Sequence, residues 1–100
     1  MSFAPYQYTP AGFGSTAVGT TFSMLPLPTG YTDTNIRLTI IYSSAPFNYR
    51  DDGGTPTATT AGTGGMPVAG TVYLAYEGLP SKFKMIAQST AGTASILYYA

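Results

Sequence analysis

One stretch decides the fold: Asn35-Ile36-Arg37-Leu38-Thr39-Ile40-Ile41-Tyr42-Ser43. Its side chains alternate with a period of two, which is typical of a β-strand with one face against a core. Such a strand separates two sets of side chains, and we predict that the core-facing set is Ile36, Leu38, Ile40 and Tyr42. The opposite set contains Arg37, Thr39, Ile41 and Ser43.

The same period of two recurs along the chain, without a convincing helical stripe. Further strands are predicted at Tyr6–Thr9, Ala17–Met24, Phe47–Arg50, Met66–Val68, Thr71–Glu77, Lys82–Gln88 and Ser95–Tyr99. Turn sequences rich in Gly, Pro and Asp separate these segments. We therefore expect an all-β fold, a compact antiparallel β-sandwich or jelly-roll-like domain of about seven or eight short strands.

Two stretches differ in composition from the predicted strands. Residues 1–16 are rich in Pro, Tyr, Gly and Ser, and we expect them to form an extended N-terminal arm before a single sandwich domain over residues 17–100. Such an arm can add as a strand to the sheet edge of a neighbour. Residues 53–65 form a Gly/Thr-rich loop, which is either a solvated excursion or a contact with a neighbouring subunit.

Composition excludes several classes of function. Only 8% of the residues are charged, and four Lys and Arg balance four Asp and Glu, whereas a nucleic-acid-binding domain normally carries a basic patch. The chain has no His and no Cys, so a Ser-His-Asp triad and a His- or Cys-ligated zinc site are impossible. No apolar run approaches the roughly 20 residues of a membrane helix. We expect no cofactor, no nucleic-acid partner and no membrane partner.

The acidic residues give little support to an enzyme. Asp51 and Asp52 are adjacent and follow Arg50, and adjacent side chains of a strand point to opposite faces. We favour a structural turn whose carboxylates bind Arg50 or nearby backbone amides, with a weak cation site as the alternative. Two-carboxylate hydrolysis is the least favoured reading, because all four acidic residues lie in or beside turn signals: Asp33, Asp51, Asp52 and Glu77.

The nine tyrosines divide into predicted core and predicted surface. Tyr42 and Tyr76 lie on the apolar side of their strands, so we expect them in the core. Of the others, the better surface candidates are Tyr6, Tyr8, Tyr31 and Tyr73, which could contact other subunits or a sugar because Tyr is rigid and amphipathic. The full set of candidate interaction residues is Phe3, Tyr6, Tyr8, Phe13, Tyr31, Tyr49, Arg50, Asp51, Asp52, Thr63 and Tyr73.

Three parts of the chain resemble a known group of proteins. They are Phe47-Asn48-Tyr49-Arg50-Asp51-Asp52-Gly53-Gly54-Thr55-Pro56-Thr57-Ala58, then Gly65-Met66-Pro67-Val68-Ala69-Gly70, and the tail from Phe83 to Tyr99. Together they resemble small structural proteins encoded in tailed-bacteriophage genomes, which carry a YRDDG, TPT and GMPV-AG block and end in a similar pair of strands. The resemblance covers roughly residues 36–100. The sequence departs from that pattern in the extra residues 60–64 and in Lys84, where Arg is usual.

The resemblance implies a place in the virion, assembled in the host cytoplasm, and no catalytic residues. We expect a capsid decoration or cement protein that braces junctions between major capsid proteins. Its partners would be the major capsid protein or other virion proteins, and its own copies would form a homo-oligomer, with a trimer favoured. The alternatives are a tail, fibre or baseplate-associated structural protein, and a module that binds host glycans.

Overall fold

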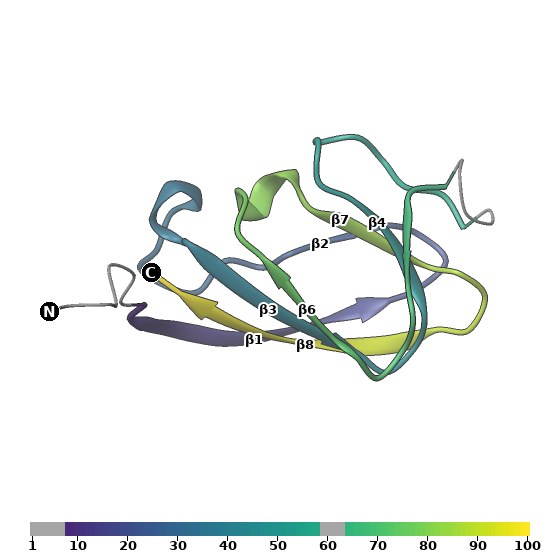
Figure 1. Cartoon of the computed structure of the whole chain (residues 1–100), viewed down its shortest axis with the longest axis horizontal. Coiled ribbons are helices and arrows are strands. Elements are labelled where there is room, and N and C mark those ends of the chain that lie inside the picture. Colours follow the sequence, from purple (N-terminus) through teal and green to yellow (C-terminus); the bar gives the residue numbers. More distant parts are fainter. Residues whose placement is uncertain (1–7, 59–63) are drawn as a thin grey trace, which may run out of the picture.

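The protein is a β-sandwich of two four-stranded antiparallel sheets (Figure 1). The computed structural model describes residues 8–58 and 64–100. The first sheet has the strand order β1-β8-β3-β6, and the second has the order β2-β7-β4-β5. The predicted sandwich class and number of strands are therefore confirmed.

The elements follow the turn signals of the sequence. The first sheet contains β1 (Pro10–Val18), β3 (Leu38–Ser43), β6 (Tyr73–Tyr76) and β8 (Gly92–Tyr99). The second sheet contains β2 (Ser23–Met24), β4 (Phe47–Arg50), β5 (Met66–Val68) and β7 (Lys84–Ala87). Two short 3-10 helices are η1 (Asp33–Asn35) and η2 (Pro80–Lys82). The strands predicted at 47–50 and 66–68 have the bounds that we expected.

The chain passes back and forth between the two sheets, so most strand pairs join distant segments. Among the eight strands of the described residues, only β4 and β5 are neighbours both along the chain and in a sheet. The first and last strands, β1 and β8, lie side by side (Figure 1). Beyond them, the amide of Thr9 donates to Ala100 and the amide of Ala100 donates to Thr9. This pairing ties both ends of the described chain to one sheet.

The core is a mixture of aromatic and aliphatic side chains between the sheets. Phe83 is fully buried and lies between Tyr49, at 4.9 Å between ring centroids, and Tyr76, at 5.0 Å. Tyr98 is also buried, and its hydroxyl donates to the carbonyl of Pro26. Burial raises the pKa of Tyr98 to about 12. The expectation that Tyr76 belongs to the core is confirmed.

The predicted orientation of β3 is wrong. Thr39, Ile41 and Ser43 face the core with exposures of 0%, 0% and 1%, and the set that we assigned to the core faces outward from Leu38 to Tyr42. A period of two separates the faces without saying which is buried, because a shift of one residue exchanges them. The large core side chains come from other strands, so β3 contributes small inward residues beside Ile41. Tyr42 is therefore not a core residue.

The N-terminal part of the sandwich also differs from the prediction. Residues 10–16, which we assigned to an extended arm, belong to β1 and pair with β8. The strand expected over 17–24 is divided, because the chain leaves the first sheet after Val18 and enters the second at β2. Glycines in β1 leave room for the chain that follows β2, because a Cβ on Gly12 would lie 2.6 Å from Pro28. Glycines that we assigned to the extended arm instead allow a proline segment to lie against the inner face of β1.

Adjacent isoleucines in β3 provide a test of the orientation. Ile41→Ala should lower the free energy of unfolding by about 2–5 kcal/mol, because it leaves a cavity in the core, whereas Ile40→Ala should cost much less. Urea unfolding followed by circular dichroism measures both variants. Equal losses, or a larger loss for Ile40→Ala, would contradict the orientation described here.

Candidate functional site

Three of the nine large apolar side chains that are exposed in the described residues lie on the outer face of the first sheet: Phe13, Tyr73 and Leu97. Strand register aligns Phe13 with Leu97, Leu97 with Ile40 and Ile40 with Ala75, which forms one row across all four strands. The next row is Ser15, Ser95, Tyr42 and Tyr73. On the other side of the first row, Leu38 lies opposite Tyr99. We call these ten residues the outer face.

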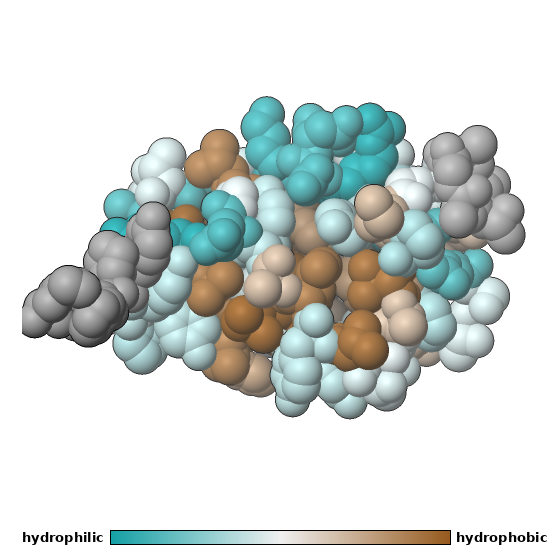
Figure 2. Space-filling model, in the orientation of Figure 1, coloured by the Kyte–Doolittle hydropathy of each residue, from teal (hydrophilic) through white to brown (hydrophobic). Residues whose placement is uncertain are grey.

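Side chains on the outer face project strongly. Phe13 is 66% exposed, Tyr73 is 77% exposed and Leu97 is 44% exposed. The ring of Tyr73 contacts the half-buried Tyr42, with 5.0 Å between centroids. Hydrophobic residues gather across the middle of the molecule in the view that shows the first sheet (Figure 2). Contiguous apolar patches of this kind on monomers are often functional.

A shallow hollow of about 130 Å³ opens on the outer face. Ser95, whose side chain is small, belongs to the row of Tyr42 and Tyr73. This row lies beside the row of Phe13 and Leu97, and all five residues line the hollow. Its lining is almost entirely apolar. The hollow is therefore suited to an apolar or aromatic group.

The charged residues of the chain lie away from the outer face. Lys84 donates to the carbonyl of Gly53 at 3.2 Å, and Asp33 accepts hydrogen bonds from the amide and hydroxyl of Ser81 in η2. Together with the 50–52 turn and Lys82, these contacts gather six of the eight charged residues near η1, η2 and the end of β4. Hydrophilic residues gather along the corresponding upper edge in Figure 2.

The remaining two charges meet at Tyr8. The hydroxyl of Tyr8 donates to Glu77 at 2.9 Å, and the guanidinium of Arg37 lies 5.6 Å from the centre of its ring. The same ring contacts Tyr99 edge-on, with 6.4 Å between centroids. Tyr8 thus contacts both charged groups at one end of the first sheet. The four strands of this sheet, β1, β3, β6 and β8, contain no charged residue.

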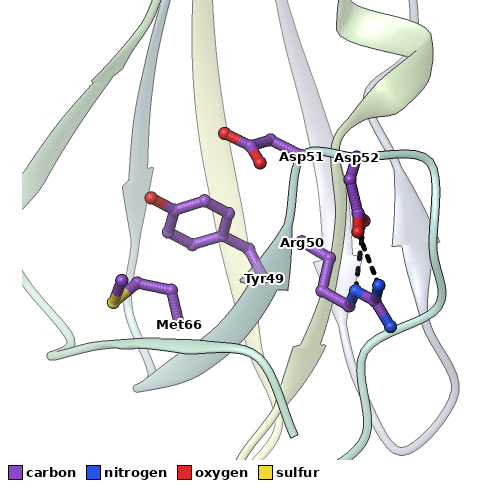
Figure 3. A pocket seen from close by; sticks show the side chains of 5 residues that line it. All are labelled: Tyr49, Arg50, Asp51, Asp52 and Met66. Atoms are coloured by element: carbon purple, nitrogen blue, oxygen red, sulfur yellow. Dashed lines mark hydrogen bonds and ion pairs between the residues drawn. The ribbon is translucent and has the colours of Figure 1, made fainter. Parts of the chain in front are cut away.

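The turn after β4 is a second candidate site. Arg50 donates to Asp52 through Nε at 3.1 Å and through a terminal nitrogen at 2.5 Å (Figure 3). The backbone amide of Gly54 also donates to Asp52, at 2.9 Å. These contacts are those of the structural turn that we favoured. The carboxylate of Asp51 points away from this pair, toward the side of Tyr49 and Met66 (Figure 3).

Hydrogen bonding sets the protonation of this turn. Hydrogen bonds from the Arg50 guanidinium, and then from the Gly54 amide, lower the pKa of Asp52 to about 2. The same contact raises the pKa of Arg50. Both side chains remain about half exposed, at 44% and 57%, so the pair is accessible to solvent and salt. Its contribution is to fix the conformation of the turn.

A pocket of about 260 Å³ lies beside the turn, lined by Tyr49, Arg50, Asp51, Asp52 and Met66. Gly65 lies where the loop returns to β5: its φ is +125°, and a Cβ would lie 2.6 Å from the carbonyl oxygen of Tyr49. The pocket is polar on one side and apolar on the other. In residues 8–58 and 64–100, no three acidic side chains lie close enough to hold a metal ion.

The structure brings the predicted site residues together in two groups. Phe13 and Tyr73 both line the hollow of the outer face, and Tyr49, Arg50, Asp51 and Asp52 line the 260 Å³ pocket. Tyr8 lies at the end of the first sheet, and Tyr31 is half-buried against the core. The candidates Phe3, Tyr6 and Thr63 lie outside the described residues.

Eight of the ten outer-face residues were absent from our candidates, among them three that line the hollow: Ile40, Tyr42 and Leu97. We had assigned the first two to the core. The signal that points to them is that β8 and β3 are apolar on both faces, although a sandwich buries only one face of each sheet. An excess of apolar residues over the number that one core accepts indicates a covered outer face.

Comparisons with known proteins give no assignment. No protein-family model, no curated protein sequence and no solved structure matches the chain significantly. The resemblance to structural proteins of tailed bacteriophages therefore stays a prediction. Neither of the helices in the described part of the chain has the length and hydropathy of a membrane span.

The Arg50–Asp52 pair predicts a specific pH dependence. The pKa of Asp52 is lowered from 3.8 to about 2 in the folded protein. The pair therefore stabilises the folded state at pH values above the pKa of Asp52 in the unfolded chain, and this stabilisation is lost as the pH falls through about 2. Arg50→Gln should move the Asp52 midpoint up toward its ordinary value. Carboxyl-carbon NMR titration measures it, with Arg37→Gln as the control that leaves it unchanged. An unmoved midpoint in Arg50→Gln would show that this contact does not set the pKa.

Proposed function

We propose that this chain is a structural subunit of a bacteriophage virion, and most concretely a capsid decoration protein. It braces junctions between major capsid proteins, with the major capsid protein or other virion proteins and further copies of the chain as partners. The observation that carries the proposal is the outer face, an apolar and uncharged sheet surface on a chain of zero net charge. Net charge near zero favours association, and interface cores are depleted in charged residues.

Three features support an assembly role. Three of the four acidic side chains engage neighbours within the fold: Asp33 binds Ser81, Asp52 binds Arg50 and Glu77 binds Tyr8. The outer face presents large exposed aromatic rings of the kind enriched at protein contacts. In a symmetric array, a weak contact is repeated many times and gains from effective concentration. The sequence resemblance supplies the setting, a virion of a tailed phage.

The location and copy number of the chain in purified virions test this proposal. We expect it in the particle at a copy number of the same order as the major capsid protein, measured by mass spectrometry against isotope-labelled peptides of both. A few copies per particle would replace the decoration role with a tail, fibre or baseplate role. Absence from purified particles would overturn the virion assignment.

A module that binds host glycans is a second candidate, favoured by one observation. The ring of Tyr73 is 77% exposed and lies beside Tyr42 on an open sheet face, and exposed aromatic rings stack on the apolar faces of sugar rings. The 130 Å³ hollow lies next to this pair.

A glycan array distinguishes this candidate. If it is correct, the purified protein binds a defined set of glycans, and Tyr73→Ala loses at least about tenfold in affinity because a stacking ring is removed. Met24→Ala, which truncates an exposed residue of the second sheet, is the control and should bind normally. No binding across the array would remove the glycan-binding candidate.

A further inference from the structure

We propose that the outer face of the first sheet docks on the same face of a second copy of this chain. The contact has two-fold symmetry, and Phe13 of each copy enters the hollow of the other. This inference deepens the proposed function and rests on it for its setting in an assembly. It names the partner and the symmetry of one contact, and it is tested in solution without the virion.

Charge favours a copy of the chain as the partner. The strands of the first sheet contain no charged residue, and the two nearest charges, Arg37 and Glu77, lie at its end against Tyr8. A face with charges of one sign would repel itself, and like charges brought together cost several kcal/mol. An uncharged face meets its own copy without that penalty, and it has no charge to select an acidic or basic partner.

The outer face has both a projection and a recess. Phe13 is 66% exposed, and it stands at the rim of the hollow of about 130 Å³ over Ser95. A cavity of roughly 150 Å³ accepts benzene, so the hollow is close to the size of one aromatic ring. Because projection and recess are neighbours on one face, two copies related by a two-fold axis can each supply the ring that the other accepts.

The exposed apolar area matches the needs of a small, specific interface. A whole aromatic side chain has roughly 150–250 Å² of surface, so Phe13 and Tyr73 leave roughly 100–190 Å² uncovered each at 66% and 77% exposure. With Leu97 and the half-buried residues beside it, the apolar area is roughly 400 Å². A standard interface buries about 800 Å² per partner, a little over half of it apolar. The outer face supplies nearly all of that apolar share.

The position of projection and recess also decides the symmetry. A ring of three subunits needs two different complementary surfaces on each subunit, whereas a two-fold contact uses one self-complementary surface. The outer face is one surface with both parts. We therefore infer a dimer through this face in place of the trimer that the sequence favoured.

Sedimentation equilibrium of the purified chain tests the pairing. The wild type should show a concentration-dependent dimer, and Phe13→Asp should weaken dimerisation at least roughly tenfold, since it buries a charge where a ring was accepted. Phe13→Ser should weaken it without adding charge. The matched control is Met24→Asp, the same kind of change at a 48% exposed residue of the second sheet, and it should dimerise like the wild type.

A second measurement does not depend on a variant. Amide NMR spectra recorded over a dilution series of the wild type should shift mainly in β1, β3, β6 and β8. A chain that stays monomeric up to its solubility limit would overturn the proposal, as would an oligomer that Phe13→Asp leaves intact or shifts confined to the second sheet.

The two proposals fail separately. A monomer in solution overturns the two-fold contact and leaves a place in the virion open to the copy-number experiment. A dimer lost in Phe13→Asp, from a chain that is absent from purified particles, keeps the contact and removes the virion assignment.

Discussion

The register of β8 is the constraint on which the rest of the structure depends. β8 pairs with β1 on one side and with β3 on the other, and its residues alternate between Ala94, Ile96 and Tyr98 in the core and Ser95, Leu97 and Tyr99 outside. A slip of one residue would exchange these sets. It would put the Tyr98 hydroxyl, which donates to Pro26 across the sandwich, into solvent. One register therefore sets both the core and the outer face.

The same arrangement separates charge from apolar surface. Six charged groups gather around η1, η2 and the end of β4, where Arg50–Asp52, Asp33–Ser81 and Lys84–Gly53 contacts fix the connections between strands. The other two meet at Tyr8. Charged groups thus stabilise turns, and the broad face of the first sheet is left for contacts that need no charge. This division is the physical basis for proposing an assembly subunit, since a solitary domain gains nothing from exposed rings such as Phe13 and Tyr73.

The sequence predicted the local structure correctly where that structure depends on residues that are neighbours in the chain. Turn signals and alternation placed β4 and β5 correctly, and the Arg50-Asp51-Asp52 sequence predicted a turn held by a carboxylate. Features that depend on contacts between distant segments could not be predicted from the sequence. Gly12 and Gly14 were assigned to an extended arm, because the prolines that pack against them are about a dozen residues or more further along the chain. Ile40 and Ile41 are adjacent and equally apolar, so which of them is buried depends on what covers each face of the sheet.

The sequence by itself determined an all-β chain, the positions of its turns and the near absence of charge, because backbone preference and alternation act between residues close in the chain. The tertiary structure alone decided which side of β3 is buried, that residues 10–16 join a sheet, and that Phe13, Leu97, Ile40 and Tyr73 meet on one face. The physical reason is that strand pairing here joins distant segments, with β4 and β5 the one pair that adjoins along the chain. Alternation gives each strand two faces, and only the packing of the two sheets decides which face is buried and which is exposed to solvent.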